Sequence, residues 1–296
     1  MLTSSGRNTA LSKRLFLTVV QGHELSEYAK RASQWGAFFI ALMFLWLLPG
    51  LPAQAQSCVA DRFDEQPGVS QVVDGDTLRL EDGRLLRFIG INTPEIGRDG
   101  NPSEAFAEQA RDVLLGLLGP NPRVSLRYDH ERQDRYGRLL AHVYLADGRS
   151  LGRQLLEQGF AAHIVVPPND WNADCYRKAE LAARESAKGV WSTLYRPIPV
   201  NELPRSTRGF RVIRGRVEYV AESRRSLWLN FPHLPGEGDR GGVALRVNRD
   251  ELANFTDWQP YELQGKEVEV RGWLYPSGEQ LLMSVRHPAA LRILSP

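Results

Sequence analysis

The chain has 296 residues, more than one average domain, so two compact units with additional segments are expected. With 42% hydrophobic and 24% charged residues, its composition is that of an ordinary globular protein. The 37 basic and 35 acidic residues give a formal net charge of +2, and the basic excess lies in residues 1–55. Overall charge therefore gives no argument for a polyanionic partner, and a nucleic-acid-binding function must be argued from local groups of residues.

An uncharged apolar run covers residues 36–51, with Lys30 and Arg31 before it and a small-x-small sequence ending at Ala55 after it. This order is typical of a signal peptide, so residues 1–55 are predicted to direct export and to be cleaved after Ala55. The expected location is secreted or periplasmic. Although the run is shorter than the roughly 20 residues of a spanning helix, an uncleaved membrane anchor is the alternative.

The chain has two cysteines, Cys58 and Cys175. In an exported protein they can form one disulfide that ties the mature N-terminus to a later helix. The alternative is that Cys175 is a small buried apolar residue.

Residues 69–192 are predicted to form the first domain. Apolar-rich runs at 70–80 and 83–91 predict strands joined by an Asp-Gly turn, and a third strand shares the second run. Two further strands are expected at 123–129 and 139–148.

Three helices are expected between and after these strands. The first begins at Ser103 as N-cap and ends at Gly119, the second runs from Ser150 to Gly159, and the third runs from about residue 169 to Lys188. Five short strands with three helices predict an α+β domain built on a small β-barrel of the oligonucleotide/oligosaccharide-binding (OB) type.

Residues 193–209 contain three prolines and little periodicity, which predicts a linker. Residues 210–296 contain five alternating runs separated by turn residues, which predict a second, all-β OB-like barrel. Its aromatic residues could stack on nucleic acid or form the barrel core: Trp228, Phe231, Trp258, Tyr261, Trp273 and Tyr275.

Polar residues lie at the ends of the two strands predicted first. Asp74-Gly75 is a turn composition, while Asp76 and Asn92 with its neighbour Thr93 could share a cation, because calcium prefers carboxylate, amide and carbonyl oxygens. Glu95 follows closely and could accept a proton from water.

Two arginines accompany these residues. Alternation places Arg87 on a largely apolar strand face, where a guanidinium needs a partner. That partner is either an internal carboxylate or the phosphate of a substrate. Arg138 stands at the start of another strand. Two arginines, a general base and a cation site together indicate phosphodiester hydrolysis.

At these residues the sequence resembles the staphylococcal nuclease (thermonuclease) family. The resemblance covers residues 70–191, in order, through VVDGDTLRL, LRFIGINTPE, EAFAEQAR, DRYGRLLAHVYLADGRSLGRQLLEQGFA, PPND and AKGVW. It implies cleavage of DNA and RNA, with the prototype a calcium-dependent endonuclease that leaves 3′-phosphates. By resemblance, the metal ligands are Asp76, Asn92 and Thr93, and the catalytic residues are Arg87, Glu95 and Arg138.

Two departures from the family pattern stand out. Asn92 occupies the place of a ligand aspartate, so calcium affinity should be lower and another divalent ion such as Mg²⁺ could serve. Tyr136 is retained as a substrate-binding residue, but residues 163–170 lack the tyrosines expected to stack on the nucleotide. His163 is not assigned a catalytic role.

The leading prediction is an exported, metal-dependent endonuclease acting on DNA, RNA or both. The alternative is a catalytically weak nucleic-acid-binding protein built on two OB-type barrels. The three residues Arg87, Glu95 and Arg138 favour the enzyme, because binding alone gives no chemical reason to keep them together.

Overall fold

The computed structural model describes residues 58–232 and 242–294. Residues 1–55, predicted to be a signal peptide or membrane anchor, lie outside this part of the chain. Within the described ranges, no helix combines the length and apolar character needed to cross a membrane. Residues 56–296 form one compact unit, in which two β-rich parts each have a hydrophobic core.

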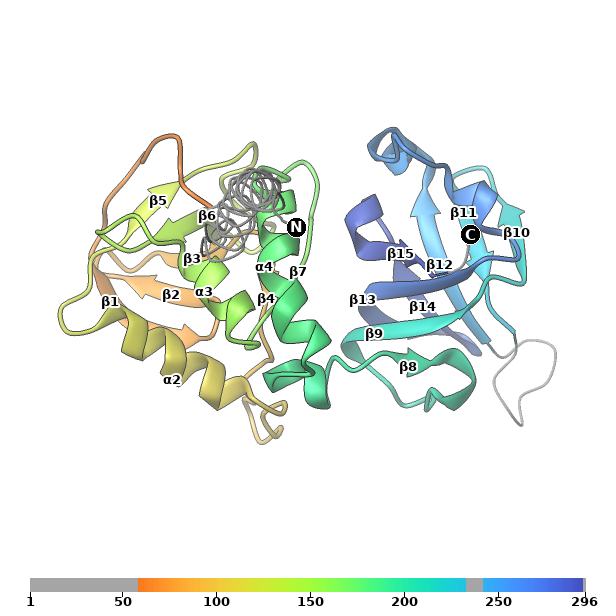
Figure 1. The fold of residues 1–296 in the computed structure, drawn as a ribbon, viewed down its shortest axis with the longest axis horizontal. Coiled ribbons are helices and arrows are strands. Elements are labelled where there is room, and N and C mark those ends of the chain that lie inside the picture. Colours follow the sequence, from red (N-terminus) through yellow and green to blue (C-terminus); the bar gives the residue numbers. More distant parts are fainter. Residues whose placement is uncertain (1–57, 233–241, 295–296) are drawn as a thin grey trace, which may run out of the picture. The chain divides into compact units, whose positions relative to one another are not determined.

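The first part is a five-stranded barrel (Figure 1). Its strands, in spatial order, are β1 (Val69–Asp74), β2 (Thr77–Leu80), β3 (Leu85–Phe88), β6 (Leu139–Tyr144) and β5 (Ser125–Arg127). β3 and β6 are parallel and the other pairs are antiparallel. The segment before β1 bridges β5 at Glu65–Leu126, and Gly68 bridges Arg123. These bridges join the first strand to the last, so the predicted OB-type barrel is confirmed.

The first predicted strand is divided by a turn. Residues 70–80 form β1 and β2, and the Asp74 carboxylate accepts the Asp76 N–H at 3.1 Å. A Cβ at Gly75 would lie 2.8 Å from Ala110 and 2.9 Å from Thr93, so only glycine fits this turn. Beyond β3, β4 (Ile91–Asn92) pairs with β7 (Ala162–His163).

The three predicted helices are present as α2 (Ala107–Leu118), α3 (Leu151–Glu157) and α4 (Ala173–Glu185). α3 begins after Ser150, where the second helix was predicted to start, and the Ser150 side chain caps it by accepting the Arg153 N–H at 3.2 Å. The prediction for Ser103 was wrong: α2 begins after Phe106, which has φ 69°, and the Ser103 hydroxyl accepts the Gly97 N–H instead.

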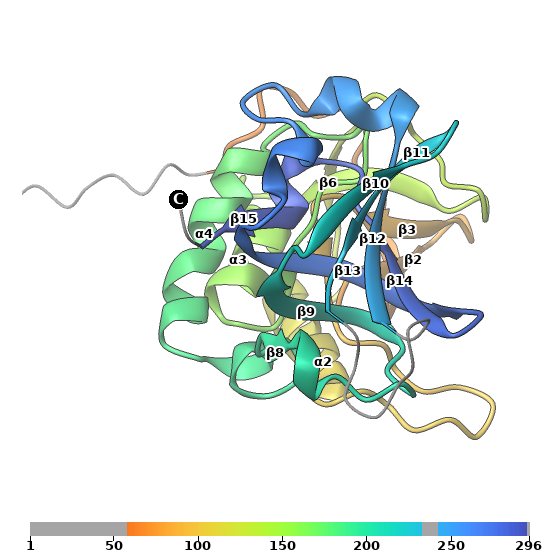
Figure 2. The same cartoon turned by 90° about the vertical axis from the view of Figure 1, so that its right-hand side faces the viewer.

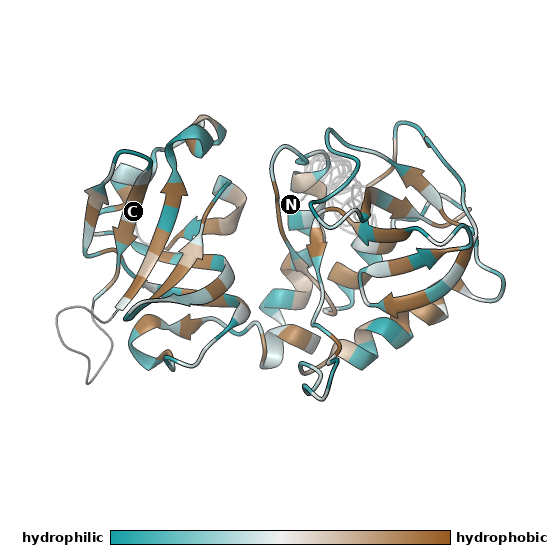
Figure 3. Cartoon of the chain, turned by 180° about the vertical axis from the view of Figure 1, so that it is seen from behind, coloured by the Kyte–Doolittle hydropathy of each residue, from teal (hydrophilic) through white to brown (hydrophobic). Residues whose placement is uncertain are grey.

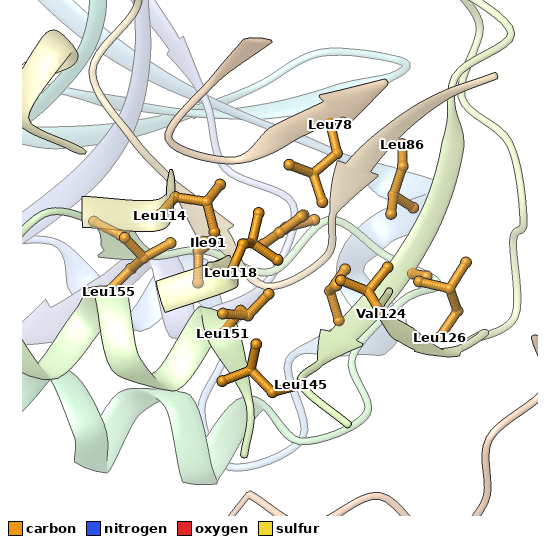
Figure 4. Close-up of a cluster of buried hydrophobic side chains, with 14 of the residues drawn as sticks. Leu78, Leu86, Ile91, Leu114, Leu118, Val124, Leu126, Leu145, Leu151 and Leu155 are labelled. Carbon is orange, nitrogen blue, oxygen red and sulfur yellow. The ribbon is translucent and has the colours of Figure 1, made fainter. Parts of the chain in front are cut away.

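Apolar residues from the helices meet those of the barrel strands in one core (Figure 4). Leu114 of α2 and Leu151 and Leu155 of α3 are fully buried, as are Leu78 of β2 and Leu86 of β3. Burial of each such side chain stabilises the fold by about 1.5–3 kcal/mol. The core therefore holds in place the strand ends that carry the predicted site.

Cys58 and Cys175 are joined by a disulfide, with a sequence separation of 117. The predicted covalent link between the start of the described chain and α4 is confirmed.

The second part is an eight-stranded sheet (Figure 2), so its predicted β character is confirmed, but the sheet has more strands than the five runs predicted for an OB-like barrel. Along the sheet the order is β10 (Tyr219–Glu222), β11 (Ser226–Asn230), β12 (Gly242–Asn248), β14 (Gln280–Ser284), β13 (Glu267–Ser277), β9 (Gly209–Arg216) and β8 (Ile198–Pro199), with β15 (Leu291–Ile293) paired to β13. Hydrophobic and hydrophilic residues alternate along several strands (Figure 3), so one face packs on the core.

The segment predicted to be a linker, residues 193–209, is packed into the fold. Tyr195 is fully buried, and Val200 and Leu203 belong to the core of the second part. A buried ion pair joins the two parts: Arg271 of β13 donates to both carboxylate oxygens of Glu180 in α4, at 2.7 and 2.8 Å. Proline content and weak periodicity predicted a linker, and the buried side chains of Tyr195, Val200 and Leu203 hold this linker against the fold.

Candidate active site

The predicted metal ligands Asp76 and Asn92 converge on one point. The Nη2 atom of Arg87 lies 3.0 Å from Asp76 Oδ2 and 3.2 Å from Asn92 Oδ1. A positively charged nitrogen thus lies between a carboxylate oxygen and an amide oxygen from different strand ends. Hard cations prefer such oxygen donors, so this donor set fits a divalent ion.

Thr93 completes this group. Its N–H donates to Asp76 Oδ2 at 2.7 Å, and its carbonyl accepts the Asn92 side-chain amide at 3.3 Å. All three predicted ligands are buried. Among residues 58–232 and 242–294, no group of three or more His, Cys, Asp or Glu side chains could hold a metal. The candidate cation site therefore depends on mixed carboxylate, amide and carbonyl oxygens.

Burial raises the pKa of Asp76 above the ordinary value of a carboxyl group, although the charge of Arg87 opposes the shift. Nearby Asp74 and Glu95 raise the pKa of Asp76 further, because like charges disfavour its ionised form. A bound divalent cation would add positive charge at this point, which would favour the ionised form of Asp76 against both its burial and the repulsion from Asp74 and Glu95.

Arg87, in β3, makes the internal ion pair that was one of its two expected roles. Besides the contacts of Nη2, its Nη1 donates to the carbonyl oxygens of Phe88 and Ile91, each at 3.0 Å. The side chain is 11% exposed. These contacts hold the guanidinium beside the cation position.

Glu95 and Arg138 line the same pocket, of about 480 Å³, with Asp74 and Glu104. Glu95 follows β4 in an exposed loop. Two hydrogen bonds hold the loop: the Glu95 N–H donates to Glu104 Oε2 at 3.1 Å, and the Glu104 N–H donates to the Glu95 carbonyl at 2.9 Å. The predicted base thus has a fixed backbone and a solvent-accessible carboxylate.

Desolvation by the surrounding protein and the negative charge of Asp74 raise the pKa of Glu95. The positive charges of Arg87 and Arg138 act in the opposite direction, and so both arginines lie within electrostatic range of this carboxyl group. A carboxylate with a raised pKa is a stronger base, which suits proton transfer from water.

Arg138 and Tyr136 lie on the loop before β6. The Nε atom of Arg138 donates to Asp134 Oδ2 at 2.7 Å, and the guanidinium carbon lies 5.7 Å from the centre of the Tyr136 ring. The Tyr136 side chain is 68% exposed, so its ring is open to a stacking partner.

Three further residues reach the site without having been predicted. Asp74 was interpreted only as a turn residue, but it is buried and raises the pKa of both Asp76 and Glu95. The sequence signal that could have identified Asp74 as a site residue was its position two residues before the predicted ligand Asp76. Glu104 supports Glu95, and the Tyr195 hydroxyl accepts the Asn92 amide at 3.1 Å. Neither has a local sequence signal, since their roles depend on long-range packing.

His163 is buried, with 2% of its surface exposed. Burial and then the charge of Arg271 lower the pKa of His163 to about 3, so the ring is neutral at ordinary pH. It therefore offers no charge for a phosphate, in agreement with its omission from the predicted catalytic residues.

The sequence is similar to those of known nucleases. A family profile described as staphylococcal nuclease homologue matches residues 85–193. The thermonuclease of Staphylococcus intermedius is 34% identical over 126 residues, 42% of this chain and 74% of the relative. Endonuclease YhcR of Bacillus subtilis is 28% identical over 172 residues, 54% of this chain but 14% of YhcR. For endonuclease YncB of the same organism the identity is 31% over 129 residues, 42% of this chain and 60% of YncB. The chain therefore belongs to the staphylococcal nuclease family, as its motifs predicted.

Proposed function

We propose that this protein is a divalent-metal-dependent endonuclease that hydrolyses phosphodiester bonds of DNA, RNA or both. The observation that carries the proposal is the convergence of the Asp76 and Asn92 oxygens on one cationic atom, beside which Glu95 and Arg138 line a pocket. The names of the relatives, thermonuclease and endonuclease, support the class of reaction and a nucleic-acid substrate.

Asp76, Asn92 and the Thr93 carbonyl would hold the metal, either Ca²⁺ or another divalent ion such as Mg²⁺. When bound, the metal would polarise a phosphoryl oxygen and offset negative charge. The buried, oxygen-rich position supports a hard cation.

The protein's own groups supply the remaining chemistry. Glu95, with its raised pKa, takes a proton from the attacking water. Arg138 and Arg87 donate to phosphate oxygens as negative charge develops on them. For Arg87, this requires that Nη2 leave the Asp76 and Asn92 oxygens, which would then be available to hold the cation. Tyr136, exposed at the rim, stacks on a base.

A second candidate function is a nucleic-acid-binding protein with little catalytic power. Trp273 and Tyr275 favour it, because they lie two residues apart on β13 and are 44% and 38% exposed. Phe231, in contrast, is buried and Trp258 packs against the core. Only some of the six aromatic residues are therefore exposed enough to stack on nucleic acid. The shared pocket of Glu95 and Arg138 favours the enzyme.

The test is incubation of the protein, residues 56–296, with plasmid DNA and with RNA in calcium, magnesium or a chelator. We expect cleavage with at least one of the two metals and loss of cleavage in the chelator. Binding without cleavage under every condition would support the second candidate and contradict the first.

Asn92→Asp is expected to increase calcium affinity by about tenfold, because ligand charge tunes calcium binding. The Tyr195 hydroxyl can donate to the new carboxylate as well as it accepts from the amide. Calorimetric titration of the protein with CaCl₂ measures the change. Asn121→Asp, at an exposed position after α2, adds the same charge elsewhere and should leave the affinity unchanged. An unchanged affinity in Asn92→Asp would exclude residue 92 from the metal ligands.

We propose export as the function of residues 1–55, with a secreted or periplasmic location. The Cys58–Cys175 disulfide supports an oxidising compartment. A membrane tether through residues 36–51 is the alternative, and fractionation of cells into membrane and soluble extracts distinguishes the two.

A further inference from the structure

We infer that β9 of the all-β part braces the nuclease site, with Tyr195 and Arg211 as positioning residues for Asn92 and Glu95. Both residues lie beyond residues 85–193, the range matched by the family profile. The inference rests on the proposed nuclease function and extends it to the second part of the chain.

The first brace acts on Asn92. Its Nδ2 donates to the Tyr195 hydroxyl at 3.1 Å and to the Thr93 carbonyl at 3.3 Å. The Thr93 carbonyl can only accept, so the NH₂ group of Asn92 faces Thr93 and Tyr195, and its Oδ1 atom faces Arg87 Nη2 at 3.2 Å. The Thr93 carbonyl sets which end of the Asn92 amide faces Arg87, and the bond from the NH₂ group to the Tyr195 hydroxyl holds the amide in that orientation.

Tyr195 is itself fixed by β9. Its fully buried ring makes an edge-to-face contact with Phe210, at 5.0 Å between ring centres, and lies 6.0 Å from Trp191. Phe210 of β9 pairs with Trp273 of β13 and lies 5.2 Å from its ring. The two strands lie side by side in the sheet (Figure 2). A row of aromatic contacts thus connects the sheet of the second part to Asn92.

The second brace acts on Glu95 and begins at the next residue of β9. Arg211 Nη1 donates to Glu104 Oε1 at 3.0 Å, and the other oxygen of the same carboxylate accepts the Glu95 N–H at 3.1 Å. The two side chains of this pair are 19% and 23% exposed, so solvent screens it only in part. Arg211 therefore positions the Glu104 carboxylate, which in turn hydrogen-bonds the backbone of Glu95, the proposed base.

Through these contacts, the second part of the chain positions the Asn92 amide and the Glu95 backbone. Groups that orient a metal ligand commonly change metal affinity or activity by about 10- to 100-fold when removed. Neither Tyr195 nor Arg211 is required to touch the substrate.

The test uses Tyr195→Phe and Arg211→Gln, each with a matched control. Tyr195→Phe keeps the ring and removes the hydroxyl; Tyr176→Phe does the same at another fully buried tyrosine, which bonds His142 and Ser150 outside the site. Arg211→Gln is matched by Arg214→Gln on the same strand, where the arginine pairs with Glu267 at 2.9 Å.

For Tyr195→Phe we expect calcium binding, measured by calorimetry without nucleic acid, to weaken by about tenfold. For Arg211→Gln we expect kcat to fall by about tenfold with little change in KM or in calcium affinity, because only transition-state geometry is disturbed. Both controls should match the wild type in these quantities.

Two measurements on metal-free protein keep the outcome independent of activity. Hydrogen exchange should be faster at the Glu95 amide in Arg211→Gln and at the Asn92 side-chain amide in Tyr195→Phe, relative to the controls. If exchange, calcium affinity and kcat in both variants equal those of their controls, the bracing role is wrong. If exchange alone changes, the contacts are structural and have no positioning role. If the wild type neither binds calcium nor cleaves, the proposed function fails, and faster exchange in the variants then shows contacts that hold Asn92 and Glu95 without a catalytic role.

Discussion

Replacing Glu95 with glutamine is expected to lower kcat/KM for nucleic-acid cleavage by about 10²- to 10⁴-fold, the usual contribution of a general base. The substitution removes the proton acceptor but keeps the size and the backbone hydrogen bonds to Glu104. The fold should be unaffected, because the Glu95 side chain is exposed. Cleavage of a fluorescent oligonucleotide in the presence of metal measures the change.

The same experiment has a pH dependence whose sign follows from the structure. Glu95 must be ionised to accept a proton, and desolvation with the charge of Asp74 raises its pKa. In the wild type kcat/KM should therefore rise as pH increases through this raised pKa and fall below it. Glu95→Gln should lose this acidic limb. Glu108→Gln, an exposed change on α2 outside the pocket, is the control, and equal rates in the two variants would remove Glu95 from the mechanism.

Removing the disulfide, by Cys58→Ser together with Cys175→Ser, is expected to lower the free energy of unfolding by about 2–5 kcal/mol. The bond closes a long loop, since its cysteines are 117 residues apart, and long loops lose the most entropy when they are closed in the unfolded chain. It also tethers the segment that leads to Glu65 and Gly68, whose bridges to β5 close the barrel.

Urea unfolding followed by tryptophan fluorescence measures this stability. Wild-type protein treated with a reductant is the matched control and should unfold at the same urea concentration as the double variant. A double variant as stable as the oxidised wild type would show that barrel closure does not depend on the disulfide.

Much of the fold follows from local pattern. Alternation in β1 to β3, the Asp-Gly turns and the start of the second helix at Ser150 were predicted, because neighbouring residues decide them. The start of α2 was not, because the Ser103 hydroxyl that could have capped the helix bonds Gly97 in the loop that follows Glu95. A tertiary contact thus overrode the local signal.

The residues of the site also fall into two groups, those that local motifs predicted and those whose contacts only the folded chain shows. Asp76, Asn92, Thr93 and Glu95 were predicted from motifs at strand ends. The first three hydrogen-bond to one another or to Arg87, and Glu95 lines a pocket with Asp74 and Arg138. Which partner Arg87 would take was left open, since alternation shows only that a guanidinium on an apolar face needs one. The folded chain places Asp76 within reach of it.

Local sequence patterns are enough to predict the strand pattern and the three helices, and the sequence also contains the family motifs and the two cysteines of the disulfide. Tertiary structure decided that Asp74 faces the site, that residues 193–209 are packed, and that Tyr195 and Arg211 support Asn92 and Glu104 across 103 and 107 residues. The physical reason is that propensity and periodicity act between near neighbours. A hydrogen bond between distant residues, in contrast, exists only after the cores of both parts have packed and brought their surfaces together.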